Sequence, residues 1–65
     1  MDTDRIKGNW LQLKGALREQ YANLTDDELE RVKADQEKLE GLLMEKSGQT
    51  KDEIRRTVDD ITNKF

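Results

Sequence analysis

The chain has 65 residues, of which 42% are charged and 32% hydrophobic, and its net charge is −3. This length allows one small domain, residues 1–65. The chain contains no cysteine, histidine or proline, so disulfides, thiolate chemistry and the commonest general base are excluded. We find no apolar stretch typical of a secretory signal and no run near the roughly 18 apolar residues of a membrane span. We therefore expect a soluble, cytoplasmic protein.

The first predicted element is an amphipathic helix. Its apolar residues are spaced by 4, 3, 4, 4 and 3 positions, which places them on one stripe of a helix. They are Ile6, Trp10, Leu13, Leu17, Tyr21 and Leu24. Because the only tryptophan lies on this stripe, we interpret it as a core anchor rather than as a platform for a ligand.

Acidic residues gather at two later places, and both patterns predict the start of a helix. Thr25 and Glu28 fit the capping box, in which each side chain accepts a hydrogen bond from the backbone N–H of the other residue. Thr50 and Glu53 repeat this spacing, and Gly48 suits the end of the preceding helix. The alternating carboxylates of a calcium-binding loop are missing from both places.

The segment 26–47 is predicted to contain two helices. A break near Lys33, Ala34 and Asp35 allows Asp35 to cap the second helix, and a short helix before the break makes a compact fold easier to build. The alternative is one continuous helix over the whole segment.

The last predicted helix carries a second stripe, Ile54, Val58, Ile61 and Phe65. No stretch alternates with a period of two, so the sequence predicts an all-α fold. We expect a compact bundle of about four short helices that resembles two crossed αα-hairpins. The predicted core consists of Ile6, Trp10, Leu13, Leu17, Leu24, Leu29, Val32, Leu39, Leu42, Leu43, Ile54, Val58 and Ile61.

The first helix also carries a candidate contact surface. Leu11 lies about 130° from the core stripe, with Gly8 and Gly15 on its own face. Glycine inside a helix costs about 1 kcal/mol relative to alanine, so two glycines on one face need a reason. Close packing against another helix of the same domain is the favoured reason. The alternative is a contact surface for a partner, which includes another copy of this chain.

Three basic residues, Lys7, Lys14 and Arg18, fall near one edge of the same helix. They are a candidate for weak nucleic-acid binding through phosphate contacts. We favour a solvated face, because no exposed aromatic residue is interleaved with them and the chain is acidic overall. The candidate partner-contact residues are Lys7, Gly8, Leu11, Lys14, Gly15 and Arg18.

Catalytic chemistry finds little support in the sequence. The glycines at 8, 15, 41 and 48 do not have the spacing of a phosphate-binding loop. Ser47 is the only serine and has no histidine to activate it, and the adjacent carboxylates of Asp59 and Asp60 diverge by about 100° on a helix. We therefore predict no enzyme activity, no cofactor and no metal site.

Five short motifs follow one another along the chain: GNWLQLKG (8–15), EQY (19–21), LTDDEL (24–29), LEG (39–41) and VDD (58–60). In order and spacing they resemble the CsbD-like family of small bacterial general stress-response proteins, over nearly the whole chain. Ala22 and Ala34 stand where that family often has glycine, and Ser47 replaces a frequent tyrosine. These departures affect the predicted break near 34 and leave fewer aromatic residues for the core.

The resemblance implies a compact bundle of short helices in a cytoplasmic protein induced by general stress. It supplies no reaction, ligand or catalytic residue. We expect a non-enzymatic protein that acts by contact with a macromolecular partner, and that is a monomer or a weak homo-oligomer. The alternatives are a hydrophilic protectant without a specific partner, which the high charge supports, and a weak nucleic-acid binder acting through the first helix.

Overall fold

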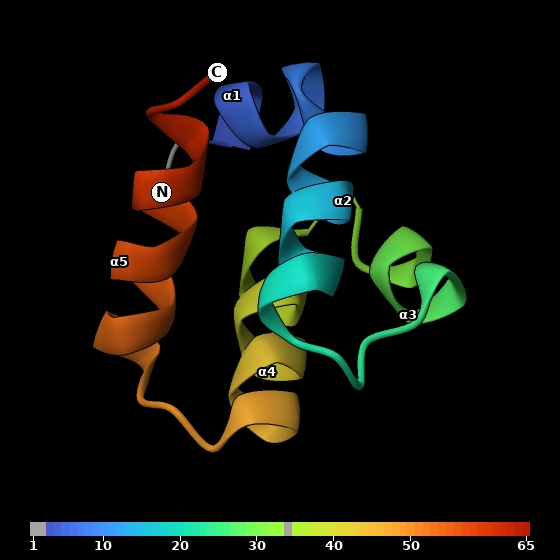
Figure 1. The fold of residues 1–65 in the computed structure, drawn as a ribbon, viewed down its shortest axis with the longest axis vertical. Coiled ribbons are helices and arrows are strands. Elements are labelled where there is room, and N and C mark those ends of the chain that lie inside the picture. The colour runs from blue at the N-terminus through green and yellow to red at the C-terminus, as the bar shows by residue number, and fades with distance from the viewer. Residues whose placement is uncertain (1–2, 34) are drawn as a thin grey trace.

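The computed structural model describes residues 3–33 and 35–65, which form five α-helices and no strand. They are α1 (Thr3–Gly8), α2 (Trp10–Gln20), α3 (Asp26–Arg31), α4 (Gln36–Ser47) and α5 (Lys51–Thr62), as Figure 1 shows. The predicted all-α class and small helical bundle are confirmed. The expected number of about four helices is corrected to five within the described residues.

The additional helix arises because the first predicted helix is interrupted at Asn9, although its apolar stripe continues from Ile6 to Trp10. This residue leaves helical geometry, with φ −121° and ψ 29°, and its side-chain amide donates a hydrogen bond to the Arg5 carbonyl at 3.2 Å. Glycine and asparagine are weak helix formers, so the Gly8–Asn9 pair is the weakest point of the predicted helix. Helix α1 therefore lies across the end of the bundle instead of continuing into α2 (Figure 1).

Helices α4 and α5 form an antiparallel hairpin, and α2 packs against both α5 and α3 (Figure 1). Two hydrogen bonds fasten α1 to this arrangement. Thr3 Oγ1 donates to Gln36 Oε1 at 2.7 Å, at the start of α4. Arg5 Nη1 donates to Asn63 Oδ1 at 3.1 Å, just after α5.

Both predicted capping boxes are present at helix starts. In the first, the Glu28 N–H donates to Thr25 Oγ1 at 3.2 Å and the Thr25 N–H donates to Glu28 Oε1 at 3.1 Å. Thr50 and Glu53 make the same pair of bonds at the start of α5. Gly48 ends α4 with a left-handed φ of 72°, a conformation that glycine adopts without steric cost.

The break between the two middle helices is also confirmed. The Lys38 N–H donates to Asp35 Oδ1 at 3.0 Å, so Asp35 caps α4 as expected. Ala34, the middle residue of the predicted break, lies outside the described residues.

The predicted core is largely correct. The buried cluster comprises Ile6, Trp10, Leu13, Leu17, Tyr21, Leu24, Leu29, Leu39, Leu43, Ile54 and Val58. Val32, Leu42 and Ile61 were expected there but pack at its edge, half-buried. Tyr21 and Leu24 lie beyond the end of α2, yet both remain buried.

One carboxylate is buried with this core. Glu40 in α4 is 1% exposed, and its Oε2 accepts a hydrogen bond from Arg55 Nε in α5 at 2.7 Å. Its Oε1 has no hydrogen-bond partner among the described residues. The pair therefore connects the two helices of the hairpin but leaves half of the carboxylate unsatisfied. This burial was not predicted from the sequence, because glutamate is seldom fully buried unless it is paired.

Candidate functional site

Leu11 is the most exposed large apolar side chain in the described part of the chain, with 78% of its surface accessible. Its neighbour Trp10 is only 4% exposed. The two residues are adjacent on a helix that places consecutive side chains about 100° apart, so burying Trp10 directs Leu11 toward solvent. The predicted position of Leu11 away from the core is therefore observed.

The favoured reason for the two glycines is wrong. Gly8 and Gly15 are exposed, and a Cβ atom added at either one would meet no neighbouring atom within 4 Å. Neither glycine provides room for close helix packing inside the fold. The surface around Leu11 is therefore left uncovered by the other described helices.

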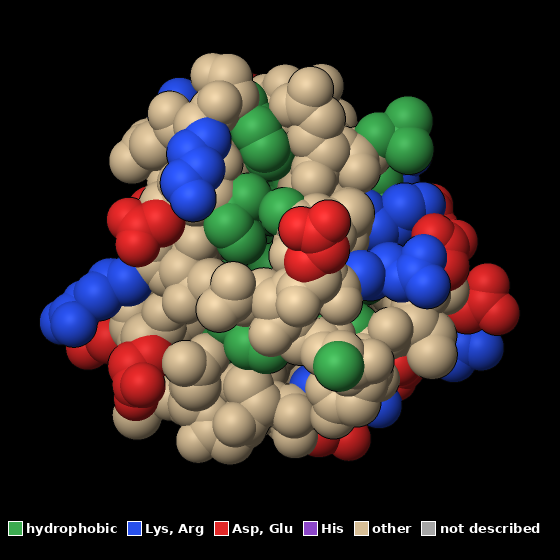
Figure 2. All heavy atoms as spheres, in the orientation of Figure 1, with side chains coloured by type: hydrophobic (Ala, Val, Ile, Leu, Met, Phe, Trp, Pro, Cys, Tyr) green, Lys and Arg blue, Asp and Glu red, His purple; other side chains and the backbone are tan. Residues whose placement is uncertain are grey.

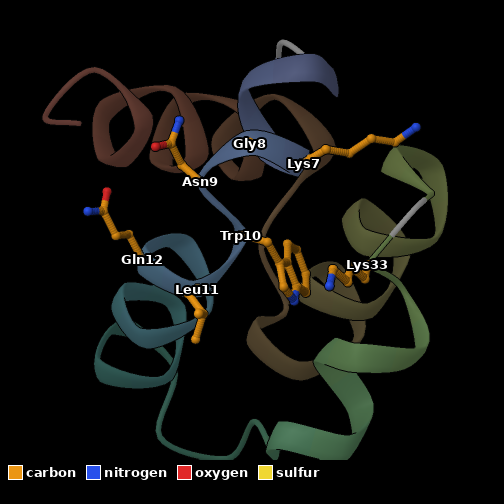
Figure 3. Close-up of a pocket in the computed structure, with 7 residues that line it drawn as sticks. All are labelled: Lys7, Gly8, Asn9, Trp10, Leu11, Gln12 and Lys33. Carbon is orange, nitrogen blue, oxygen red and sulfur yellow. The ribbon is translucent and has the colours of Figure 1, made fainter.

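A shallow hollow of about 380 Å³ lies beside Leu11. Its walls come from the end of α1, the beginning of α2 and the turn after α3. The residues that line it are Lys7, Gly8, Asn9, Trp10, Leu11, Gln12 and Lys33. Figure 3 shows the Trp10 ring and the Lys33 side chain near its middle, with Lys7 extending to one side and Leu11 to the other.

Two of the predicted basic residues are engaged by the acids of α3. Lys14 Nζ lies 2.9 Å from Asp26 Oδ1 and 2.7 Å from Glu30 Oε1, and Arg18 Nη1 lies 3.9 Å from the same Asp26 oxygen. Trp10 Nε1 also donates to Glu30 Oε1, at 3.0 Å. This network joins α2 to α3. Its carboxylates also offset the positive charges of Lys14 and Arg18, which a bound phosphate would have to contact.

The same contacts shift the pKa values of Glu30 and Lys14. The hydrogen bond from Lys14, and then that from Trp10, lowers the pKa of the Glu30 carboxyl below its ordinary value. The hydrogen bonds to Glu30 and then to Asp26 raise the pKa of Lys14. Both groups are therefore held in their charged forms at neutral pH, so we assign Lys14 a structural role between α2 and α3.

Lys7 and Lys33 differ from Lys14 in having no such partner. Both side chains are exposed, and within residues 3–33 and 35–65 no carboxylate forms a salt bridge with either one. They bring two positive charges to the hollow beside Leu11, and the charge of Lys33 also makes a small contribution to lowering the pKa of Glu30.

The structure therefore divides the predicted contact residues into two groups. Lys7, Gly8 and Leu11 line one hollow, whereas Lys14, Gly15 and Arg18 lie outside it. Sequence reasoning missed Lys33, which reaches the hollow from the turn after α3. The predicted break at 33–35 was the available signal, because a turn there folds the chain back past Trp10.

The described residues include no group of three or more side chains suited to holding a metal ion. None of the helices in that part of the chain has the length and apolarity needed to span a bilayer. The groups that line this surface are two ammonium groups, the side-chain amides of Asn9 and Gln12, the Leu11 side chain and part of the Trp10 ring.

Comparison with known proteins places the chain in a family. A family model described as CsbD-like matches residues 4–56. A UPF0337 protein of Rhodopseudomonas palustris is 45% identical over 60 residues, which cover 92% of this chain and 91% of that protein. A UPF0337 protein of Rhizobium meliloti is 47% identical over 60 residues, 92% of this chain and 87% of that protein.

A further UPF0337 protein, from Pseudomonas aeruginosa, is 38% identical over 65 residues, which cover 100% of this chain and 100% of that protein. No solved structure gives a significant match. The resemblance carried by the sequence motifs is thus confirmed by the family model and by relatives of nearly equal length, and the chain belongs to the CsbD-like family.

Proposed function

We propose that this protein is a non-enzymatic, cytoplasmic stress-response protein that acts by contact with another macromolecule. The contact surface consists of Leu11 and the hollow beside it. The observation that carries the proposal is the 78% exposure of Leu11 next to a hollow that no other described helix covers.

A single exposed leucine is common on protein surfaces and needs no explanation by itself. Leu11 differs because it borders a hollow that is also lined by part of the Trp10 ring and by two exposed lysines, which form no salt bridge with the described acids. Interfaces gain most of their free energy from a few residues in well-packed, desolvated pockets that a polar rim surrounds. Burial of apolar surface contributes about 25 cal/mol per Å², and Leu11 is the large apolar side chain with the highest exposed fraction in the described part of the chain.

The proposal is tested by cross-linking capture of the tagged protein from bacterial cells under osmotic stress. We expect a specific macromolecule to be enriched with the natural chain and lost with Leu11→Lys. Phe65→Lys is the matched control, because Phe65 is the other exposed large apolar residue, at 39%, and lies outside the hollow. Equal capture by the natural chain and Leu11→Lys would contradict the proposal. Both variants must keep the thermal transition of the natural chain.

A second candidate function is that of a folded protectant that needs no specific partner. Its support is the surface itself, where acidic and basic side chains are interspersed along both edges of the face in Figure 2, in a chain that is 42% charged. The test is protection of a freeze-sensitive enzyme, with albumin at equal mass concentration as control. Protection above albumin that Leu11→Lys retains would favour this function over the first.

A further inference from the structure

We propose that the hollow beside Leu11 docks an acidic segment of a partner protein, which presents one apolar side chain between carboxylates. The exposed face of an acidic amphipathic helix has this chemistry. The inference rests on the proposed function and adds to it the chemical class of the partner.

The apolar part of the surface is small and well defined. Leu11 stands at the edge of the hollow, part of the Trp10 ring lies within it, and Gly8 adds no side chain to its wall. A volume of about 380 Å³ is at the lower end of the range for ligand pockets. We therefore expect it to receive one apolar side chain rather than an extended groove-filling helix face.

The two charged side chains that line the hollow are both basic, and the nearby Glu30 carboxylate is engaged by Trp10 and Lys14. Lys7 reaches the hollow from the end of α1, and Lys33 reaches it from the turn after α3. Neither forms a salt bridge with an acid in the described ranges. Complementary charge on a partner speeds association and suppresses wrong partners, so a matching segment carries carboxylates on both sides of its apolar residue.

A second copy of this chain that docked through the same surface would not supply the carboxylates that the two lysines require. In a two-fold dimer the same patch faces itself, which would place the Lys7 and Lys33 ammonium groups of one copy near those of the other. A nucleic-acid duplex is also disfavoured, because its row of phosphates would extend beyond Lys7 and Lys33 onto the adjoining surface. There the carboxylates of Asp26 and Glu30 lie beside Lys14 and Arg18, whereas a short segment docked in the hollow alone would not reach that surface.

The test uses designed peptides as probes and the full chain as receptor. One probe is an alanine-based helix of about 20 residues that carries a leucine flanked by glutamates three and four positions away. The second probe has lysines in place of the glutamates, the third has serine in place of the leucine, and a short DNA duplex is the fourth. Binding is followed by Trp10 fluorescence, since this is the chain's only tryptophan, and by amide chemical shifts at Gly8, Leu11 and Lys33.

We expect the acidic leucine peptide to bind at least tenfold more tightly than the other three probes. Lys7→Glu combined with Lys33→Glu should reduce its affinity at least tenfold and improve binding of the basic peptide. The matched control is Lys51→Glu with Arg56→Glu, which changes the net charge equally on exposed positions of α5 that do not line the hollow. It should change the affinity less than twofold.

The inference is overturned if the acidic peptide does not bind saturably, if both double variants weaken binding equally, or if the DNA duplex binds more tightly. Should the charge-reversed variant not fold, Lys7→Gln with Lys33→Gln provides the same comparison. If Leu11→Lys still abolishes capture from cells while the acidic peptide fails to bind, the contact function stands and only the partner class is wrong. If Leu11→Lys has no effect on capture, the contact function itself fails.

Discussion

Trp10 has two roles in this small protein. Its ring is buried in the core, and its indole N–H donates to Glu30 Oε1 at 3.0 Å. Glu30 in turn accepts from Lys14. One residue therefore contributes apolar burial and also holds α3 against α2.

We predict that Trp10→Ala lowers the free energy of unfolding by about 3–5 kcal/mol, as for other buried large aromatic residues. Domains of this size hold only about 3–5 kcal/mol from one core, so this variant is expected to be largely unfolded. Urea unfolding followed by circular dichroism measures the change. Trp10→Phe, which keeps an aromatic ring but removes the N–H, should lose clearly less stability. A shift in the melting temperature of Trp10→Ala below about 2 °C would show that Trp10 is not a core anchor.

The sequence predicted that Leu11 faces away from the core, but it did not predict which residues surround Leu11. The 100° rotation per residue predicts that it faces away from the core stripe, and its 78% exposure agrees. The rule does not predict what surrounds it, because Lys33 comes from a turn 22 positions later whose path depends on the packing of α3. The predicted role of Gly8 and Gly15 failed for the same reason, since periodicity does not show which faces meet.

Local sequence patterns determined where most helices begin and end. The boxes at Thr25 and Thr50, the cap at Asp35 and the left-handed Gly48 are short-range features, and all four are observed. The interruption at Asn9 was missed, because the apolar spacing continues through it and Ile6 remains buried on both interpretations. Here tertiary packing decides whether a weak helix former continues or breaks the helix.

The hairpin of α4 and α5 gives a prediction about the buried Glu40–Arg55 pair. Arg55→Ala should lower the melting temperature by at least about 4 °C, because it leaves the 1% exposed Glu40 carboxylate without the hydrogen bond from Arg55 Nε. Arg56→Ala is the matched control on the same helix and should have little effect. Differential scanning fluorimetry measures both.

Combining Arg55→Ala with Glu40→Leu should restore the lost stability, since replacing a buried ion pair by apolar groups is often neutral or favourable. If the double variant melts lower than Arg55→Ala alone, the buried carboxylate is not the source of the loss.

The attachment of α3 gives a prediction about pH. Its acids are bound by bases from its neighbours. The hydrogen bond from Lys46, with a contribution from Thr25, lowers the pKa of Glu28 below its ordinary value of 4.5, and Lys14 lowers that of Glu30. A carboxyl with a lowered folded-state pKa stabilises the fold above its unfolded pKa, and this contribution disappears as the pH falls through the folded-state value.

Thermal stability should therefore be highest near neutral pH and fall as the pH drops below about 4.5. Glu30→Gln should melt below the natural chain at about pH 7, and the difference should shrink as the pH falls below the ordinary value of 4.5 and through the lowered folded-state pKa of Glu30. Melting temperatures over this range provide the measurement. A difference that stays constant over the range would mean that ionisation of Glu30 does not support the fold. Asp27→Asn is a suitable control, because Asp27 is exposed in the same helix.

Taken together, the helices are held unequally. Helices α2, α4 and α5 each contribute two or more buried side chains, whereas α1 contributes only Ile6 to the core. Thr3 and Arg5 of α1 also bind residues far along the sequence through side-chain hydrogen bonds. Regions with few buried apolar contacts open locally at low free energy, without unfolding of the rest.

Opening of α1 has a consequence for the surface beside Leu11, because Lys7 and Gly8 belong to this helix. The hollow exists in full only in the fraction of molecules in which α1 is docked. A ligand that contacts Lys7 would shift this local equilibrium toward the docked form, and its apparent affinity would be reduced by the undocked fraction. If the proposed recognition takes place at this surface, the interruption at Asn9 makes it depend on the docking of the six residues of α1.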